Sequence, residues 1–314
     1  PKLGANKNQS TTSGLSSGGF MAVQMHVAYS DVFKGAGVFA GGPYDCAQGK
    51  EMTALTACMS SPVMINDMIL EKATDKYVSS SSIADTANLK DQPVYMFSGT
   101  MDYTVRQGVM DKLQSYYKHY GSDVEYENSI VASHTMPTDL DRNKNACTLL
   151  KSPFIANCNY DGAGEMFKKI LPNQEKNPIK DRDLDYEKHG EVIAFDQTEF
   201  MANGDISMDD TGYVYVPNGC KNGKHKCKIH VALHGCQQGK SYVDETYVTD
   251  AGYLEWAGTN NIITLFPQAT KQQLKNPQGC WDWWGYAGAN YAQQDGPQMK
   301  AIMSMIDRLH EAPT

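Results

Sequence analysis

Residues 13–28, SGLSSGGFMAVQMHVA, hold the pattern that decides the fold. Gly14, Ser16 and Gly18 fit G-x-S-x-G, a motif in which a serine occupies a sharp turn between a strand and a helix. The strained backbone of such a turn leaves no room for side chains two positions either side of the serine, which explains the glycines. The motif also arises by chance, but apolar residues at helical spacing follow it at once. It therefore predicts a turn that leads into a helix over residues 17–29.

Short apolar runs alternate with helix-like stretches along the rest of the chain. Strands are predicted at residues 38–43, 93–98, 124–126, 212–217, 228–233 and 262–266, and further helices at residues 107–120, 249–259 and 298–309. This alternation indicates an α/β fold with a mostly parallel sheet and helices on both faces. Residues 164–197 begin with a possible helix and then become polar, with Pro172 and Pro178, so we interpret them as a connection.

The composition is that of a globular protein with ample material for a core. Of the 314 residues, 41% are hydrophobic and 20% are charged, and the formal net charge is −8. A nucleic-acid partner would require clustered Lys and Arg, so this charge argues against one. The lysine-rich stretches at 168–180 and 221–228 are interrupted by other residues, and we interpret them as solvated surface. No apolar run approaches the ~18 residues that a membrane span requires.

The eight cysteines indicate an oxidising compartment. Most of them have a close neighbour in sequence within loop-like segments, where disulfides form readily. Metal binding is the alternative, but the chain has no C-x-x-C motif. Spacing alone does not fix the pairing. Because the chain begins at Pro1 without an apolar leader, we expect a secretory leader to have been removed.

A serine nucleophile needs a base, and the base needs a carboxylate that orients it. Asp102 follows the predicted strand at 93–98, at the end of a strand where α/β sheets place active groups. His134 comes later in the chain, and the order Ser, Asp, His is that of the α/β-hydrolases. The structural alternatives are an aspartate that forms a turn and a histidine that is hydrogen-bonded within a loop.

An oxyanion hole is predicted from two backbone N–H groups. His234 and Gly235 follow the strand at 228–233 and form an H-G turn, which resembles the turn that supplies one donor in lipases and esterases. The other donor would be the amide of Ser17, directly after the nucleophile. We interpret His234 as a structural residue of the turn rather than as a second base.

The H-G turn usually precedes the nucleophile, whereas here it follows. Moving residues from about 190 to 314 in front of Lys2 restores the usual order. Such a circular permutation is tolerated when the termini lie close together. We therefore predict a single catalytic domain over residues 1–314, with a nucleophile, Asp and His half at 1–165 and an oxyanion-loop half at 190–314.

These stretches resemble the single-domain, circularly permuted poly(3-hydroxybutyrate) depolymerases of the fungal type. The matching stretches follow one another in the same order over nearly the whole chain: SGLSSGGFMA (13–22), FAGGPYDC (39–46), SGTMDYTV (98–105), SHTMPTD (133–139), NCNYDGAG (157–164), DTGYVYVP (210–217), VALHGCQQ (231–238) and GCWDWWGY (279–286). The polar stretch at 166–197 is the least similar.

The resemblance implies a secreted serine esterase with an α/β-hydrolase fold that cleaves polyesters of short hydroxy acids without a metal or organic cofactor. It implies the following roles: nucleophile for Ser16, orienting acid for Asp102, general base for His134, oxyanion donors for the amides of Ser17 and Cys236, and a wall of the substrate crevice for Trp281. The alternative for Trp281 is a place in the core, where Trp-Asp-Trp-Trp clusters more often lie.

The same resemblance implies that each cysteine pairs with its sequence neighbour. The implied disulfides are Cys46–Cys58, Cys147–Cys158, Cys220–Cys227 and Cys236–Cys280. We expect a monomer, because a monomer suits attack on an insoluble surface, and an extracellular or periplasmic location.

Two other functions compete with this interpretation. A feruloyl or acetyl esterase that acts on plant polysaccharide would share the catalytic groups and differ only in its pocket. A non-catalytic, polymer-binding protein on a hydrolase scaffold is the alternative of another class, and the order of Ser16, Asp102 and His134 argues against it.

Overall fold

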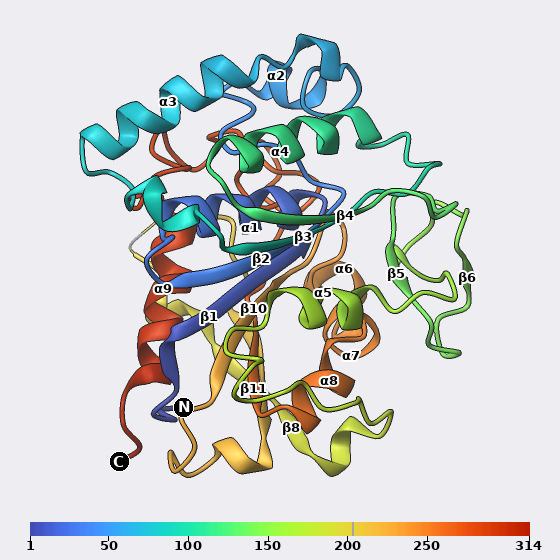
Figure 1. Cartoon of the computed structure of the whole chain (residues 1–314), viewed down its shortest axis with the longest axis vertical. Coiled ribbons are helices and arrows are strands. Elements are labelled where there is room, and N and C mark those ends of the chain that lie inside the picture. Colours follow the sequence, from blue (N-terminus) through green and yellow to red (C-terminus); the bar gives the residue numbers. More distant parts are fainter. Residues whose placement is uncertain (203) are drawn as a thin grey trace.

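A mixed sheet of eight strands forms the centre of residues 1–202 and 204–314, which the computed structural model describes (Figure 1). Its strands lie in the order β4-β3-β2-β1-β10-β11-β9-β8. Their bounds are Asn6–Leu15 (β1), Phe33–Phe39 (β2), Pro93–Phe97 (β3), Asp123–Glu127 (β4), Gly190–Asp196 (β8), Thr211–Pro217 (β9), Lys228–Leu233 (β10) and Ile262–Phe266 (β11). Pairing is parallel from β4 to β11 and antiparallel at β9 and β8. A small parallel sheet holds Met136–Thr138 (β5), Asn145–Ala146 (β6) and Ile155–Asn157 (β7).

Helices connect the strands and cover the sheet. Their bounds are Ser17–Ala28 (α1), Glu51–Leu55 (α2), Asp67–Ser79 (α3), Gln107–His119 (α4), Gly162–Ile170 (α5), Lys240–Val243 (α6), Thr246–Asp250 (α7), Tyr253–Thr259 (α8) and Pro297–His310 (α9). Short 3-10 helices lie at Pro62–Met64 (η1), Thr86–Leu89 (η2), Tyr186–Lys188 (η3), Gln197–Phe200 (η4) and Asn218–Cys220 (η5).

Each face of the sheet has its own layer of helices, because successive strand residues point to opposite faces. In β3, Val94 and Met96 pack into a core that includes α1, α4 and α9. Tyr95 and Phe97 of the same strand pack into a core that includes α5, α7 and α8. Both cores share one sheet, so the predicted single-domain α/β fold with helices on both faces is confirmed.

The two ends of the chain meet beside β1 (Figure 1). The amide of Leu3 donates to the carbonyl of Leu309 at 3.2 Å, and the amide of Gly4 donates to that of Glu311 at 2.8 Å. Strand β1 lies between β2 and β10, so it joins the early and late parts of the sequence into one sheet. These are the arrangements that the predicted circular permutation requires.

Two predicted elements have different bounds in the structure. The strand expected at 38–43 is β2, which starts earlier and ends at Phe39, because Ala40 adopts a positive φ of 50°. The helix expected at 249–259 is divided into α7 and α8 by Gly252, whose φ of 94° interrupts helical geometry.

The segment interpreted as a connection contains part of the sheet. After α5, the chain returns through residues 171–189 and enters β8 at Gly190. Strand β8 is the antiparallel edge strand, and most of its side chains are exposed or half-buried. The apolar residues 192–195, VIAF, form the middle of this strand, so the interpretation as a connection alone was wrong for this stretch.

Candidate active site

Ser16 occupies the turn between β1 and α1, at the end of the central strand. Its backbone has φ 59° and ψ −119°, a strained conformation for a residue with a side chain. The amide of Ser16 donates to the carbonyl of Phe39 at 2.9 Å, and its carbonyl accepts from the amide of Phe20 at 3.0 Å. These bonds hold the turn from both sides, so the predicted strand–turn–helix is present.

The two glycines of the motif are required by close backbone contacts. A β-carbon on Gly14 would lie 2.1 Å from the carbonyl oxygen of Gly18. One on Gly18 would lie 2.1 Å from the carbonyl oxygen of Leu233, the last residue of β10. The start of α1 therefore packs directly against the end of β10, which brings the H-G turn to the serine.

His134 and Asp102 form a buried pair. Nδ1 of His134 lies 2.8 Å from Oδ2 of Asp102, and the two residues are 8% and 3% exposed. The other carboxylate oxygen accepts from the amides of Thr104 and Val105 at 3.0 and 2.9 Å. With the Asp102 carboxylate fixed in this way, Nδ1 of His134 carries the proton and Nε2 is left to accept one.

Backbone contacts between two loops place this pair. The amide of Met101 donates to the carbonyl of Ala132 at 3.0 Å, and the amide of Thr100 donates to that of Ile130 at 2.9 Å. A β-carbon on Gly99 would lie 2.2 Å from the carbonyl oxygen of Ala132, so the two loops approach closely. The loop after β3 and the loop before β5 thus carry Asp102 and His134 to one place.

Ser16 and His134 line the same cavity, which has a volume of about 480 Å³. No direct hydrogen bond joins their side chains, both of which lie in the described part of the chain. Serine–histidine contacts of this kind are often loose in the absence of substrate and tighten when it binds. The structure therefore brings the predicted nucleophile and base to a common cavity.

Two backbone amides beside Ser16 have no acceptor within the described residues. They belong to Ser17, the first residue of α1, and to Cys236, which follows the H-G turn. A β-carbon on Gly235 would lie 3.3 Å from Cβ of Ser16, so the turn lies against the serine. Unpaired amides next to a nucleophile suit the stabilisation of negative charge, and the amide of Ser17 is favoured further by its place at the N-terminus of α1.

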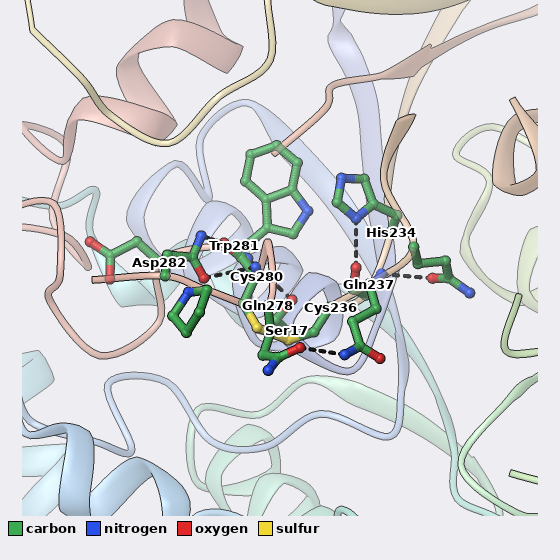
Figure 2. The surroundings of a disulfide bond; sticks show 12 residues. Ser17, His234, Cys236, Gln237, Gln278, Cys280, Trp281 and Asp282 are labelled. Carbon is green, nitrogen blue, oxygen red and sulfur yellow. Dashed lines mark hydrogen bonds between the residues drawn. A yellow bond between two sulfur atoms is a disulfide. The ribbon is translucent and has the colours of Figure 1, made fainter. Parts of the chain in front are cut away.

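His234 supports the H-G turn. Its Nε2 accepts from the amide of Ala269 at 3.0 Å, so Nδ1 carries the proton and donates to the carbonyl of Gly235 at 2.7 Å (Figure 2). Burial lowers the pKa of His234 to about 4, because a charged imidazole loses its hydration there. The ring is fully buried and neutral, which agrees with the interpretation as a structural residue.

The cavity is largely apolar. Its lining residues are Leu15, Ser16, Phe20, Glu51, Leu55, Met59, Thr104, Val105, His134, Leu150, Phe154, Gly235, Cys236, Gln237, Gln238, Asn276, Pro277, Gln278, Cys280, Trp283 and Trp284. Three aromatic residues besides Phe154 and four residues with side-chain amides are among them: Phe20, Trp283, Trp284, Gln237, Gln238, Asn276 and Gln278. The lining has the character of a site for an uncharged ligand with repeated carbonyl groups.

The predicted crevice wall, Trp281, is absent from this lining. Its side chain is fully buried, with its ring centroid 5.4 Å from that of His234. Trp283 and Trp284 contribute to the cavity instead. The expectation for Trp281 is therefore corrected, because its position behind the H-G turn keeps its ring out of the crevice.

All eight cysteines form disulfides, and each pairs with its sequence neighbour as the resemblance implied. The bonds are Cys46–Cys58, Cys147–Cys158, Cys220–Cys227 and Cys236–Cys280. Only the last has both cysteines in the lining of the cavity. Figure 2 shows it between the H-G turn and the segment that carries Trp281.

Two features are absent from residues 1–202 and 204–314. None of the helices there is long and apolar enough to cross a membrane. No group of three or more His, Cys, Asp or Glu side chains in these ranges could hold a metal ion.

The central strand, the serine at the turn after it and the helical layers on both faces define a hydrolase of the α/β-hydrolase class. No family model matches the chain. A poly(3-hydroxybutyrate) depolymerase of Delftia acidovorans is 45% identical over 313 residues, which cover 98% of this chain and 61% of that protein. A polyhydroxybutyrate depolymerase of Talaromyces funiculosus is 41% identical over 324 residues, covering 98% of this chain and 91% of that protein.

Solved structures agree with these relatives. The crystal structure of the PHB depolymerase from Penicillium funiculosum matches with a TM-score of 0.88 at 39% identity, covering 99% of this chain and 98% of that chain. A PHB depolymerase complexed with an R3HB trimer matches equally well, with a TM-score of 0.88 at 39% identity. The chain therefore belongs to the poly(3-hydroxybutyrate) depolymerase family. It spans about three fifths of the length of the Delftia relative.

Proposed function

We propose that the protein is a secreted serine esterase that hydrolyses poly(3-hydroxybutyrate) or a related polyester of short hydroxy acids. The observation that carries the proposal is the convergence of Ser16, His134 and Cys236 on one apolar cavity, with the amides of Ser17 and Cys236 unpaired. The relatives named as depolymerases support the choice of polyester, as does the matching depolymerase that was solved with an R3HB trimer.

The first half of the reaction forms an acyl-enzyme. Nε2 of His134 takes the proton of the Ser16 hydroxyl, and Oγ attacks the ester carbonyl carbon. The carboxylate of Asp102 keeps the imidazole in the required tautomer and stabilises the imidazolium. The amides of Ser17 and Cys236 donate to the oxyanion of the tetrahedral intermediate. The carbon–oxygen bond to the leaving chain then breaks, and His134 returns the proton to the departing alkoxide.

The second half releases the other fragment. Water gives a proton to Nε2 of His134 and attacks the acyl carbon through the same oxyanion hole. The bond to Oγ of Ser16 breaks, Oγ recovers the proton, and a product with a free carboxyl group leaves. One water is consumed for each ester bond, and no cofactor enters either half.

The cavity lining suits an uncharged polymer of ester units. Phe20, Trp283 and Trp284 present apolar surface for the methyl groups of such a chain. Gln237 and Gln278 line the same cavity and have side-chain amide groups that can donate to ester carbonyls. An acidic or basic substrate would find few charged partners in this lining.

Exposed apolar side chains near the cavity give a surface for adsorption to a solid polymer. Some of them come from the segment of α2, η1 and α3, where Leu55 lines the cavity and Val63 is 89% exposed. Leu150 also lines the cavity, and Tyr103, which precedes the lining residue Thr104, is 66% exposed. Large exposed apolar side chains on segments that line a cavity support a role in binding an apolar surface.

The remaining features of the proposal concern location, assembly and chain order. Four disulfides support an extracellular or periplasmic location, because such bonds persist in oxidising compartments. We propose a monomer without a nucleic-acid or membrane partner, which sedimentation can test. We also propose that residues 1–165 and 190–314 are the two halves of one circularly permuted catalytic unit.

Clearing of a poly(3-hydroxybutyrate) suspension, measured beside hydrolysis of methyl ferulate, tests the function. The wild type should clear the suspension and Ser16→Ala should not, although the variant should still adsorb to the polymer. If the wild type hydrolyses methyl ferulate and does not clear the suspension, the proposed mechanism stands, but the proposed substrate is wrong and a feruloyl ester takes its place. Clearing by Ser16→Ala would reject the nucleophile, and a wild type that adsorbs without hydrolysing any ester would indicate a binding protein.

A further inference from the structure

Both proposed oxyanion donors are attached to the same dipeptide, Cys280–Trp281 (Figure 2). Cys236 is bonded to Cys280 through the disulfide. The hydroxyl of Ser17 accepts a hydrogen bond from the amide of Trp281 at 3.2 Å. Adjacent residues of one segment therefore hold the two residues whose amides are the proposed oxyanion donors.

The dipeptide is itself fixed in place. The side-chain oxygen of Asn276 accepts from the amide of Cys280 at 2.9 Å, and its amide nitrogen donates to the carbonyl of Cys280 at 2.7 Å. Asn276 is fully buried. A second connection joins the same segment to the H-G turn, where the amide of Gln237 donates to the carbonyl of Gln278 at 2.8 Å. The dipeptide thus has little freedom to move relative to the core.

The two donors come from different parts of the fold. Ser17 begins α1, whereas Cys236 follows the turn after β10. An oxyanion is stabilised only when both donors reach one oxygen at hydrogen-bond distance, and small errors in that geometry are costly. The packing of the start of α1 against the end of β10 brings these two amides together. The Cys280–Trp281 segment adds a second connection between them, through one disulfide and one hydrogen bond.

We propose that the Cys280–Trp281 dipeptide is a clamp that sets the separation of the two oxyanion donors. The hydroxyl of Ser17 and the Cys236–Cys280 bond are then positioning groups, which act on the amides and do not touch the substrate. This inference rests on the proposed function, because it gives the two amides their role in acyl transfer.

Ser17→Ala tests one arm of the clamp, since it removes the hydroxyl and keeps the amide. We expect kcat on a soluble butyrate ester to fall about tenfold with KM nearly unchanged, a part of the loss that follows deletion of an oxyanion donor. The affinity for butaneboronic acid, which mimics the tetrahedral intermediate, should fall by the same factor. Ser10→Ala is the matched control, because Ser10 is a buried β1 serine whose hydroxyl donates to the carbonyl of Lys7 at 2.7 Å, on the same strand as the elbow.

The double variant Cys236→Ala/Cys280→Ala tests the other arm and leaves no free thiol. Its kcat should fall about 10- to 100-fold, again without a matching change in KM. Cys220→Ala/Cys227→Ala removes a disulfide that lies outside the cavity lining and should keep the wild-type kcat. All variants are assayed well below their measured unfolding temperatures, so that lost stability is not counted as lost catalysis.

Combining the two arms gives the decisive measurement. If one clamp holds both donors, breaking the second arm adds little, so the triple variant should lose less than the product of the two separate factors. Multiplied losses, or a wild-type kcat in Ser17→Ala, would overturn the clamp. Equal losses in kcat/KM and in the affinity for substrate would also contradict the clamp, because they would indicate that the whole active site is disrupted. Ser16→Ala, measured in parallel, separates these outcomes from failure of the proposed function, which an active Ser16→Ala or a wild type that hydrolyses no ester would show.

Discussion

The indole ring of Trp283 lies flat on the ring of Phe20, with 3.9 Å between ring centroids and 11° between planes. Phe20 belongs to α1, one turn after the nucleophile, whereas Trp283 comes from the late segment that follows the Cys236–Cys280 bond. The carboxylate of Asp282 accepts from the successive amides of residues 284–287 and so fixes the path of this segment. The two halves of the chain together build one wall of the cavity.

Trp283→Leu should therefore weaken the binding of long substrates more than that of short ones. Loss of the stacked surface should lower kcat/KM about 10- to 100-fold on a hydroxybutyrate trimer ester, in line with the burial of one large apolar side chain. On a p-nitrophenyl acetate substrate the loss should stay within about threefold, because the acetyl group does not reach the wall. Trp256→Leu, in α8 on the opposite face, is the control. Equal losses on both esters would contradict a role in substrate binding.

Asp102→Asn should abolish most of the catalysis while the fold is kept. An asparagine can still accept from the amides of Thr104 and Val105, but its NH2 group would face Nδ1 of His134. The imidazole would then carry its proton on Nε2 and could not accept one from Ser16. By analogy with other serine enzymes, kcat on a soluble ester should fall about 10⁴-fold with KM little changed. A loss of less than tenfold would assign the base to another residue.

Three fully buried histidines predict that stability falls in mild acid. Burial lowers the pKa of His26 and of His234 to about 4, and that of His230 to about 3, from 6.5. Between pH 6.5 and these values the unfolded chain binds more protons, so the free energy of unfolding decreases as the pH falls through this window. On complete titration the loss reaches about 3 kcal/mol for His26 and for His234 and about 5 kcal/mol for His230, and it vanishes above pH 6.5.

Guanidinium unfolding at several pH values between 7 and 4.5 measures this dependence. His26→Gln should lower stability at pH 7, because the ring is hydrogen-bonded to Tyr117 and Gln92. It should also flatten the slope by about one proton. An unchanged slope in this variant would mean that His26 does not contribute to the acid sensitivity.

The disulfides should differ in their contribution to stability according to the loop that each closes. Cys236–Cys280 spans a sequence separation of 44, and Cys220–Cys227 spans 7. In the chain-entropy description, removing the first by paired alanines should cost about 4 kcal/mol and removing the second about 2.5 kcal/mol. Chemical denaturation of the two double variants measures the difference. A larger loss for the shorter loop would show that native-state packing, rather than loop closure, dominates.

The polar groups that the structure brings together at the cavity could be proposed from the sequence, because their chemistry restricts residue type and position. Ser16 and Gly235 lie where local motifs demand a sharp turn, and Asp102 follows a strand that is recognisable from its apolar run. The choice among the tryptophans could not be made in the same way. Trp281 and Trp283 are the same residue type two positions apart, and which of them reaches the cavity depends on contacts with residues far away in sequence.

For both tryptophans these contacts join residues that are far apart in the sequence or lie in different elements. The amide of Trp281 is held by Ser17, and the loop that carries Trp283 is held by Asp282 together with Gln298. No periodicity in the sequence reports such pairings. The edge strand β8 was missed although its residues 192–195, VIAF, are apolar, because the charged residues around this run give the whole segment a polar composition.

A re-permuted chain tests whether the two halves form one unit. A short Gly/Ser linker can join Thr314 to Pro1, because the adjoining segments already pair through Leu3 and Leu309. The new ends can be opened between Lys176 and Asn177, which are exposed and lie outside the helices and strands.

This variant should fold, keep a kcat within about threefold of the wild type and unfold within a few degrees of it, since every strand keeps its neighbours. A matched variant opened at Gly37, inside β2, should fail to fold, because a break there separates residues that pair with both β1 and β3. Unfolding temperature and ester hydrolysis are measured for both. If the first variant were as damaged as the second, the order of the chain would itself be needed to assemble the site, and the description as two interchangeable halves would have to be given up.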